Sequence, residues 1–486
     1  MIPYASWLSS GDNAWQMTAA TLVGLMSIPA LAVLYGGLVQ KKWAMNTTLM
    51  VFVTFCLVLI TWVLWAYKMG FGTTLIHFGS VNVLGDPRTI LGANALEGQA
   101  SIPLVDPAMP GYAVSKTGEI LNTGFKLPGA SVEYFQFVFA AITPILFIGS
   151  VLGRVSFKAW MVFVPLWITF AYAVNAFLLW GGGYWASKGA LDFSGGYVIH
   201  LAAGVSGFVS AAVIGPRLKR DREKAVPNNL LFVAVGAGIL WFGWNVFNGG
   251  DPYFAGSNAA AAIVNTNLAT AVAMMTWILM DMFLSSDKKP TFLGALNGMI
   301  CGLVGITPAA GYVNGFGAVI IGLVASAVVW VAWYTLPKYV WPFNKVDDAL
   351  GVIYTHGIAG LLGGLLVGVL ADPNVIEYPA APGGASFSGA GWIWGHHPHQ
   401  LLVQLLAALT IIVWAGVVTF LIWMIIKHVF RMKLRFSDEE LEIGDVAVHG
   451  EEAYPQEDVL TTKLSYTAEA EASPTTEGAV SAKANE

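Results

Sequence analysis

The chain has 486 residues, of which 56% are hydrophobic and 11% are charged, against about 25% charged in an ordinary soluble domain. This composition excludes a soluble globular protein, and the 54 glycines suit helices that pack closely in a bilayer. We therefore predict an all-α polytopic membrane protein embedded in the lipid bilayer.

The net charge of −5 is unevenly distributed along the chain. Residues 1–435 contain 22 Lys and Arg against 16 Asp and Glu, whereas residues 436–486 contain 2 against 13. We predict a membrane domain over 1–435 and a cytosolic acidic tail over 436–486. The part of the tail after about residue 455 is poor in aromatic residues and rich in Ala, Glu, Ser and Thr, so we expect it to be disordered.

Apolar runs of about 17–25 residues predict eleven transmembrane helices. They lie near residues 13–39, 45–67, 135–152, 159–180, 194–214, 230–249, 258–282, 291–312, 317–336, 350–371 and 401–426. The first run is interpreted as a permanent helix, because the residues before it lack the basic region of a secretory signal. With the N-terminus outside, the inner loops hold 17 Lys and Arg and the outer loops 5. Since cytoplasmic loops retain positive charge, we predict the N-terminus out and the C-terminus in.

Two histidines lie inside these apolar runs, where an ionisable ring is costly. His200 falls in the fifth span and His356 in the tenth, and each begins the pattern His-x-x-x-Gly-x-x-Gly. Each histidine thus closes a five-helix half, which predicts two inverted repeats, about 13–214 and about 230–371, and a final helix at about 401–426. The rings should meet near the bilayer midplane. The alternative is that each ring only satisfies a hydrogen bond between helices.

Four stretches of the sequence are similar to known motifs. DNAW begins at Asp12 and IPALAVLYGGLV at Ile28, DFSGGYVIH ends at His200, and VDDALGVIYTHGIAG begins at Val346. Together they resemble the signature of the ammonium transporter family (Amt/Mep/Rh), in matching order over residues 12–454. The resemblance is to prokaryotic-type Amt members. It implies an ammonium transporter, for which methylammonium is an analogue substrate.

The resemblance also implies roles for particular residues. His200 and His356 match the family's pore-lining pair of histidines. Phe139, in FQFVFAAIT, and Phe247, in GWNVFNGG, match the two rings of a phenylalanine gate. Trp180, in LLWGGG, matches the aromatic wall of an outer ammonium site, to which Phe139 also belongs. Taken alone, the two phenylalanines are typical of core packing and Trp180 of an interfacial aromatic belt.

Two acidic residues accompany this outer site. Asp192 matches the family's aspartate beside it, and we expect a mainly structural role at a helix start, with a direct proton role as the alternative. Asp251 stands where many relatives have a serine that hydrogen-bonds ammonium. Its carboxylate would either raise the local cation concentration or cap the turn before Pro252. The outer segment 73–130 is longer than a connector needs, which favours a lid or a subunit contact.

The chemistry of ammonium explains why such residues would be combined. Ammonium resembles hydrated potassium in size and charge, but unlike potassium it can lose a proton. An aromatic face attracts a cation by about 0.5–2 kcal/mol, and paired imidazoles can pass a proton. We therefore expect ammonium to be recruited at the outer aromatic site and deprotonated. Ammonia and the proton would then be conducted to the cytoplasm through a hydrophobic pore lined by the two histidines.

Further expectations concern partners and competing functions. The resemblance implies a homotrimer in the plasma membrane, the inner membrane of a prokaryotic cell, and regulation by a cytosolic PII-type signal protein. We predict no enzyme, no cofactor, no nucleic-acid partner and no metal. His396, His397 and His399 have metal-like spacing but lack a matching carboxylate or thiolate. The competing functions are a neutral-gas channel of the Rh kind and an ammonium sensor that signals through its tail.

Overall fold

The computed structural model describes residues 5, 7–79, 81–100, 113–114, 120–122, 125–378 and 387–455. Within them, ten helices are long and apolar enough to cross a membrane. They are Ser10–Leu38, Lys41–Phe71, Gly129–Ile148, Phe157–Ser187, Gly196–Ile214, Leu230–Gly249, Ser257–Leu284, Gly315–Tyr339, Ile353–Leu370 and His399–His428. The chain is a helical, polytopic membrane protein, as its composition predicts.

Several of these helices consist of α-helical segments joined by π-helical or 3-10 turns (η). In the first half they are α1 (Ser10–Leu25), η1 (Met26–Ala30), α2 (Leu31–Leu38), η2 (Lys41–Trp43), α3 (Ala44–Thr61), η3 (Trp62–Ala66), α4 (Tyr67–Phe71), α6 (Gly129–Ile148), α7 (Phe157–Trp167), η4 (Ile168–Tyr172), α8 (Ala173–Leu179), η5 (Gly196–Leu201) and α10 (Ala202–Ile214). In the second half they are α12 (Leu230–Gly249), α13 (Ser257–Leu284), α14 (Phe292–Ile306), α15 (Gly315–Tyr339), η6 (Ile353–Ile358), α16 (Ala359–Leu370) and α18 (His399–His428). Pro29 lies within η1, where its missing N–H interrupts the regular ladder.

The span predicted at 291–312 differs from the structure. It corresponds to α14, which has 15 residues and ends at Ile306. Residues 307–312 form turns instead. The carbonyls of Thr307 and Pro308 accept hydrogen bonds from the backbone N–H groups of Ser194 and Phe193, each at 3.1 Å. The chain therefore leaves the helix here to meet another segment, and the count of eleven spans stays a prediction.

Small elements occupy the connections. The short helices are α5 (Ala93–Glu97), α9 (Tyr184–Ser187), α11 (Lys219–Glu223), α17 (Trp392–Gly395), α19 (Asp438–Ile443) and α20 (Asp445–His449). Three antiparallel hairpins pair β1 (Thr74–Phe78) with β2 (Val81–Gly85), β3 (Ala113–Val114) with β4 (Ile120–Asn122), and β5 (Ile376–Tyr378) with β6 (Phe387–Ser388). In the first, Phe78 lies opposite Val81 and Thr74 opposite Gly85. The prediction of an all-α chain misses these hairpins, although the β-branched residues of TLIHF and VNVLG favour strands. Segment 73–130 lies partly outside the described residues.

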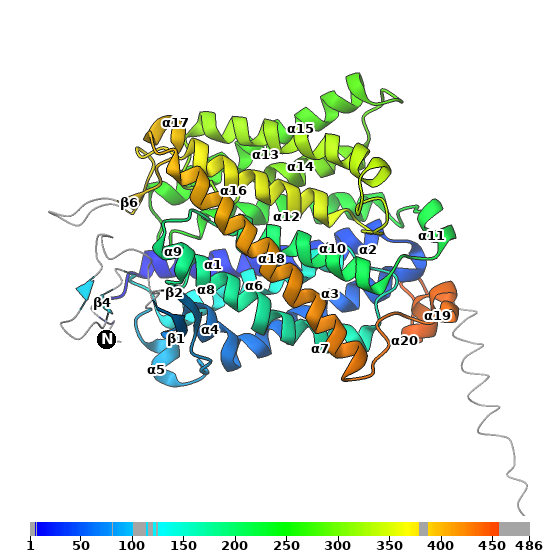
Figure 1. Cartoon of the computed structure of the whole chain (residues 1–486), viewed down its shortest axis with the longest axis horizontal. Helices are drawn as coiled ribbons and strands as arrows, with labels where there is room; N and C mark the ends of the chain where they lie inside the picture. The colour runs from blue at the N-terminus through cyan, green and yellow to red at the C-terminus, as the bar shows by residue number, and fades with distance from the viewer. Residues whose placement is uncertain are drawn as a thin grey trace, which may run out of the picture.

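The two ends of the helix bundle differ (Figure 1). One end, called the strand end here, carries β1, β2, β4, β6, α5, α9 and α17. The other, the tail end, carries α11, α19 and α20. α1 begins at the strand end, and α18 crosses the bundle obliquely toward the tail end.

Small residues allow the helices to pack closely. A Cβ added to Gly302 of α14 would lie 2.6 Å from the Cα of Thr270 in α13, and one added to Gly298 would lie 2.6 Å from the Cβ of Trp277. Helix backbones this close are typical of membrane bundles, where packing stabilises helix association. The bundle therefore holds its central helices in fixed positions.

The first part of the acidic tail packs against the tail end. The Phe436 ring stacks on Trp43 with centroids 5.5 Å apart, and Leu441 is buried. The Asp445 carboxylate accepts hydrogen bonds from the backbone N–H groups of Met45 at 2.7 Å and Asn46 at 2.9 Å, which caps the start of α3. The described part of the tail, which ends at residue 455, therefore packs over the start of α3. The prediction that 456–486 is disordered concerns residues outside those that the structure describes.

Candidate functional site

The first histidine sits in a π-helical turn with a defined start. The Asp192 carboxylate accepts hydrogen bonds from the backbone N–H groups of Tyr197 at 3.0 Å and Val198 at 3.1 Å. Gly195 has φ of 104°, a left-handed conformation that glycine adopts without strain. These two residues begin η5, which carries the fully buried ring of His200. The expected structural role of Asp192 therefore fits its geometry.

The second histidine is built in the same way. Asp348 lies eight residues before His356, as Asp192 lies eight residues before His200, and its carboxylate accepts a hydrogen bond from the backbone N–H of Ile353 at 2.8 Å. Gly351, three residues after the aspartate, has φ of 70°. Asp348 was not singled out from the sequence. The repeated pattern Asp-x-x-Gly-x-x-x-x-His would have identified it.

Each of these units is also anchored to the turn after a helix of the opposite half. Phe193 and Ser194 bond to the carbonyls that follow α14. Ala349 and Leu350, at the matching positions of the second unit, donate to the carbonyls of Ser150 and Gly149 after α6, each at 3.2 Å. We call residues 192–201 the first unit and 348–358 the second unit. Their correspondence favours the predicted repeats.

The two rings meet, as the sequence predicts. His356 Nδ1 lies 3.3 Å from His200 Nδ1, and the ring centroids are 5.3 Å apart. A hydrogen bond between these atoms requires one ring to carry hydrogen on Nδ1 and the other to lack it, so the two rings hold different tautomers. His200 Nε2 is buried and has no hydrogen-bond partner among the described residues. The pair is therefore arranged to share a proton.

Two glycines bring the units together. A Cβ added to Gly204, one turn after His200, would collide with the backbone of Gly357, next to the second histidine. A Cβ added to Gly360, one turn after His356, would lie 2.6 Å from the Gly196 carbonyl oxygen and 3.0 Å from the His200 Cβ. The space left beside each histidine by the missing side chain of the glycine is therefore occupied by the backbone of the opposite unit.

Aromatic rings surround the histidines on the strand-end side. Trp244 stacks on His200 at 5.3 Å, and its Nε1 donates to Thr307 Oγ1 at 2.8 Å. The Phe247 ring lies 6.2 Å from His200 and stacks on Phe139 at 4.1 Å with an interplanar angle of 7°. Both phenylalanines are fully buried. The two residues predicted as a gate thus lie face to face directly beside the histidine pair.

Trp180 lies beyond this phenylalanine pair. Its ring centroid is 6.4 Å from Phe139, and it stacks on Phe71 at 6.5 Å. Its Nε1 donates to the Asp192 backbone carbonyl at 2.7 Å, which fixes the ring against the start of the first unit. Trp180 is partly exposed, unlike the phenylalanines. Phe71 was missed from the sequence, since nothing distinguishes it from other aromatic residues of its span.

Several buried oxygen atoms belong to Asp251, which follows the helix of Phe247, and to residues that interact with it directly or through Tyr253. Gln136 Oε1, Tyr172 Oη and Asp251 Oδ2 are buried and have no hydrogen-bond partner among the described residues. Gln136 Nε2 donates to the hydroxyl of Tyr253 at 2.5 Å. Electrostatic interactions link Tyr172, Tyr253 and Ser194 to Asp251. We call Gln136, Tyr172, Ser194 and Asp251 the oxygen cluster, a set of acceptors suited to a small donor-rich cation.

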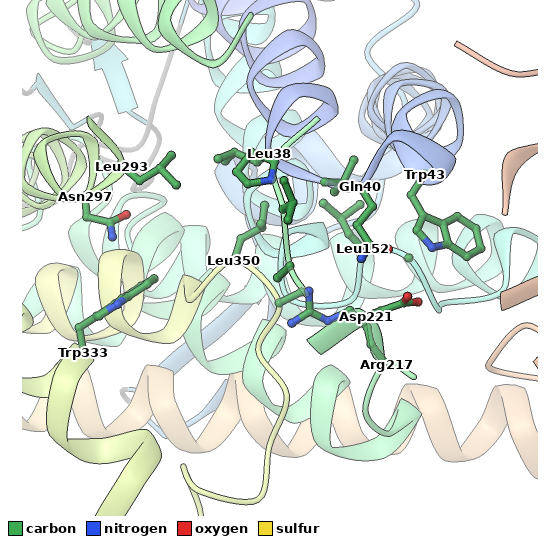
Figure 2. A pocket seen from close by; sticks show the side chains of 16 residues that line it. Leu38, Gln40, Trp43, Leu152, Arg217, Asp221, Leu293, Asn297, Trp333 and Leu350 are labelled. Carbon is green, nitrogen blue, oxygen red and sulfur yellow. The ribbon is translucent and has the colours of Figure 1, made fainter. Parts of the chain in front are cut away.

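A pocket of about 290 Å³ lies toward the tail end (Figure 2). Its walls include the apolar or amide side chains of Leu38, Trp43, Leu152, Asn297, Trp333 and Leu350, and its charged residues are Arg217 and Asp221. Arg217 binds Asp347 through two contacts of 2.8 and 3.0 Å. Burial raises the pKa of the Asp347 carboxyl, but Arg217 and Arg154 outweigh this effect and hold the pKa at about 2. The two charged residues of the pocket lining are therefore both paired, Arg217 with Asp347 and Asp221 with Lys42.

The tail reaches the rim of this pocket. Lys42 forms a salt bridge with Asp221 at 3.0 Å and also donates to the backbone carbonyl of Leu441 at 2.8 Å. Trp43, which lines the pocket, is the residue on which Phe436 stacks. The acidic tail also pairs with α11, where Arg220 forms a salt bridge with Glu442 at 3.8 Å. The Lys42 contacts were not predicted.

Metal binding finds no support in this part of the molecule. Among the described residues, no group of three or more His, Cys, Asp or Glu side chains is arranged to hold a metal ion. His396, His397 and His399 lie at the strand end, between α17 and the start of α18, away from the histidine pair.

The model of the Ammonium Transporter Family matches residues 14–454, which include both units, the phenylalanine pair and the oxygen cluster. The chain belongs to the ammonium transporter family. Because this family consists of transporters, the prediction that the chain is not an enzyme is confirmed.

Members of the ammonium transporter family resemble the chain over most of its length. Ammonium transporter 3 member 2 of Oryza sativa subsp. japonica is 48% identical over 453 residues, which cover 93% of this chain and 91% of the relative. Ammonium transporter 2 of Arabidopsis thaliana is 47% identical, covering 92% and 89%. The crystal structure of Saccharomyces cerevisiae Mep2 superposes with a TM-score of 0.73 at 28% identity, covering 89% of each chain. These two relatives are plant proteins, so the prokaryotic type predicted from the sequence is not supported.

Proposed function

We propose that this member of the ammonium transporter family recruits ammonium at an aromatic site, deprotonates it, and conducts ammonia and the proton past the His200–His356 pair. The observation that carries the proposal is the contact of 3.3 Å between two fully or almost fully buried imidazoles. Such rings are costly in an apolar bundle unless they act on a substrate or a proton.

Recruitment uses the Trp180 face and the neighbouring oxygen cluster. A cation over an indole gains about 0.5–2 kcal/mol, depending on how far it is desolvated. Ammonium offers four N–H donors, and the buried acceptors Gln136 Oε1, Tyr172 Oη and Asp251 Oδ2 replace the water it gives up. Phe139, whose ring lies between Trp180 and Phe247, adds a second aromatic surface.

The stacked phenylalanines act as the gate. Their ring centroids are 4.1 Å apart, so the rings must rotate before a molecule can pass between them. An ion that crosses this apolar gap loses its hydration without compensation, whereas neutral ammonia loses far less. Deprotonation before the gate therefore excludes potassium, which has no proton to release.

The histidines carry the proton beyond the gate. Since the two Nδ1 atoms share one hydrogen, a proton that arrives on one ring moves to the other by exchanging their roles as donor and acceptor. His200 Nε2 supplies a further position for ammonia or water. The pocket lined by Trp43 and Trp333 is the exit.

The same proposal includes the predicted topology: eleven helices, counting α14, in the plasma membrane, with repeats over about 13–214 and 230–371 and the final helix at about 401–426. The strand end faces outward and the tail end faces the cytoplasm. In its support, α1 begins at the strand end and the tail leaves at the opposite end, which requires an odd number of crossings.

Partners form the last part of the proposal. An apolar groove of about 460 Å³ between α1 and α12 is lined by Leu22, Leu25, Val235, Phe242 and their neighbours, and it supports a homotrimer. Binding of a PII-type protein at the cytoplasmic face would act on the exit pocket, whose rim the tail touches. Native mass spectrometry of the purified protein, with and without a PII protein, tests both expectations.

Solid-supported-membrane electrophysiology on proteoliposomes tests the function itself. An ammonium-evoked inward current that potassium does not evoke is the expected result. Ammonium uptake without current would instead indicate a neutral-gas channel. Specific ammonium binding without uptake or current would indicate a sensor, and the absence of binding and uptake would contradict the proposal.

A further inference from the structure

The Asp251 carboxyl has features that cation attraction alone does not explain. It follows the end of α12, is 8% exposed, and has an Oδ2 atom without a hydrogen-bond partner among the described residues. No salt bridge to it occurs in that part of the chain. A buried carboxylate without a partner is costly. The Ser194 hydroxyl interacts with this carboxyl, so it is the Oδ2 atom that is satisfied only when a further donor binds to it or when it takes up a proton.

The neighbours of Asp251 make it a stronger base than an exposed aspartate. The charged groups that act on it are Glu377 of β5 and Asp192, and the hydroxyls that face it belong to Ser194, Tyr172, Tyr253 and Tyr312. Burial raises the pKa of the Asp251 carboxyl well above its ordinary value; the Ser194 hydroxyl opposes this, and Glu377 and Asp192 add to it. A base with a raised pKa is better matched to accepting a proton near neutral pH.

Asp192, the other aspartate beside the site, is less suited to this task. Its Oδ2 atom accepts two backbone hydrogen bonds, from Tyr197 and Val198, and these bonds favour the charged form. Protonation would weaken the start of η5, which carries His200. Protonation of Asp251 breaks no hydrogen bond to its Oδ2 atom among the described residues.

We propose that Asp251 accepts the proton of ammonium at the aromatic site, an inference that rests on the proposed function. One N–H bond of ammonium breaks, its electron pair stays on nitrogen, and an O–H bond forms on the carboxylate. Ammonia then moves past Phe139 and Phe247. The carboxyl gives its proton to water, which carries it to the His200–His356 pair, and the carboxylate is restored for the next cycle.

Initial rates of ammonium uptake into proteoliposomes test this step, measured at external pH values from about 5.5 to about 8.5 and at fixed internal pH. The variants are Asp251→Asn, which keeps the shape, Asp251→Ser, which keeps a hydroxyl, and Asp251→Glu, which keeps the base. We expect the wild-type maximal rate to rise with pH through an apparent pKa above that of an exposed aspartate. The Asn and Ser variants should lose this rise and at least about tenfold in maximal rate, and their KM should also rise because an acceptor for ammonium is lost. The Glu variant should recover part of both.

Several results would overturn the inference. A raised KM with wild-type maximal rate and pH profile in the Asn and Ser variants would reduce Asp251 to cation attraction. A lower rate with an unchanged pH profile would make its role structural. Trp180→Leu is the matched control, since it should raise KM and keep the pH-dependent rise. If the wild-type protein takes up no ammonium, the proposed function itself fails. If it takes up ammonium and the variants keep its maximal rate and pH profile, only the role of Asp251 fails. Size-exclusion profiles of all variants identify misfolding, and a misfolded Asn variant leaves the Ser and Glu variants to decide.

Discussion

The first unit and the second unit share one backbone design but lie toward the two opposite mouths of the proposed pore, the aromatic site and the exit pocket. In both, an aspartate caps a π-helical turn, a glycine with positive φ starts it, and a histidine follows eight residues after the aspartate. The first unit lies against Trp180, which donates to the Asp192 carbonyl, whereas the second unit directly follows Asp347, which binds Arg154 and Arg217. Repetition of the backbone places the histidines, and divergence of the side chains gives the two units different surroundings.

This difference separates two kinds of residue. Asp192, Asp348 and the glycines at the crossing are parts of the shared frame, so their replacement should act on folding in both halves. Trp180 and Asp251 belong to one mouth only, so their replacement should act on substrate without disturbing the other half. The following experiments test that separation.

The largest effect is expected at the point where the halves meet. The double variant His200→Ala, His356→Ala removes both proton-carrying rings from an apolar passage, so ammonium-driven current should fall by at least about a hundredfold. Electrophysiology on proteoliposomes measures this, and a size-exclusion profile like that of the wild type serves as the control for folding. An undiminished current in this variant that still discriminates against potassium would disprove the relay.

The glycine crossing should be nearly as sensitive, through stability. Gly204→Ala and Gly360→Ala each place a methyl group against the backbone of the opposite unit, which should cost about 1–3 kcal/mol. Gly11→Ala in α1 is the matched control, because a Cβ there has no neighbour within 4 Å. Thermal unfolding in detergent should rank both variants below the control. Equal stability of all three variants would mean that Gly204 and Gly360 do not pack as closely against the opposite unit as the structure shows.

The capping aspartates should share one effect and differ in another. Asp192→Ala and Asp348→Ala each remove a helix cap, at about 0.5–2 kcal/mol. Only the first should also raise KM, because loss of this cap would displace the backbone carbonyl of residue 192, to which Trp180 donates. Thermal unfolding and uptake kinetics on the same preparations compare the two. A larger rise in KM for the Asp348 variant would contradict the assignment of the mouths.

Replacement of the aromatic face should give a moderate effect on affinity. Trp180→Leu removes a π surface worth about 1 kcal/mol, so KM for ammonium should rise by up to about tenfold with the maximal rate retained. Concentration dependence of the ammonium current measures it. A lost maximal rate with unchanged KM would show that Trp180 mainly holds the first unit in place.

The smallest effects are expected at the far end of the tail. Deletion of 456–486 should leave ammonium transport nearly unchanged. Deletion from 436 onward removes the Asp445 cap of α3 and the Lys42 contact, and should reduce activity several-fold and abolish sensitivity to a PII protein. Uptake assays of the two truncated chains provide matched controls for each other. Wild-type transport by the chain ending at 435, still inhibited by PII, would exclude a regulatory role.

Much of the helical frame could be predicted from the sequence, because a membrane span requires a minimum apolar length. The pairing of His200 with His356 followed from the parity of the helices. The length of α14 did not, since the apolar residues Ala309, Ala310 and Val313 continue its pattern while their backbone bonds elsewhere.

The site was predictable only where single residues stand out from their surroundings. Histidines in apolar runs are rare, and the resemblance to the family drew attention to Asp251. Tyr172 and Phe71 look like ordinary apolar-span residues, so only the fold reveals that Phe71 stacks on Trp180 and that Tyr172 interacts with Asp251. Asp348 could have been identified by its spacing to His356. The role of Lys42 could not, because its contact with the Leu441 carbonyl depends on how the tail packs in the fold.

The reciprocal crossing of Gly204 and Gly360 has a mechanical consequence. Each of these residues lies against the backbone of the opposite half, and both halves are further tied by the strand-like pairs at Ser194 and Leu350. Rocking of one repeat against the other, the motion of many transporters, would have to separate these contacts at the centre of the molecule. Substrate passage then depends on rotation of side chains such as Phe139 and Phe247 within a stationary scaffold. In the proposed mechanism, turnover is then set by the opening of this gate, by proton transfer and by the desolvation of one small cation.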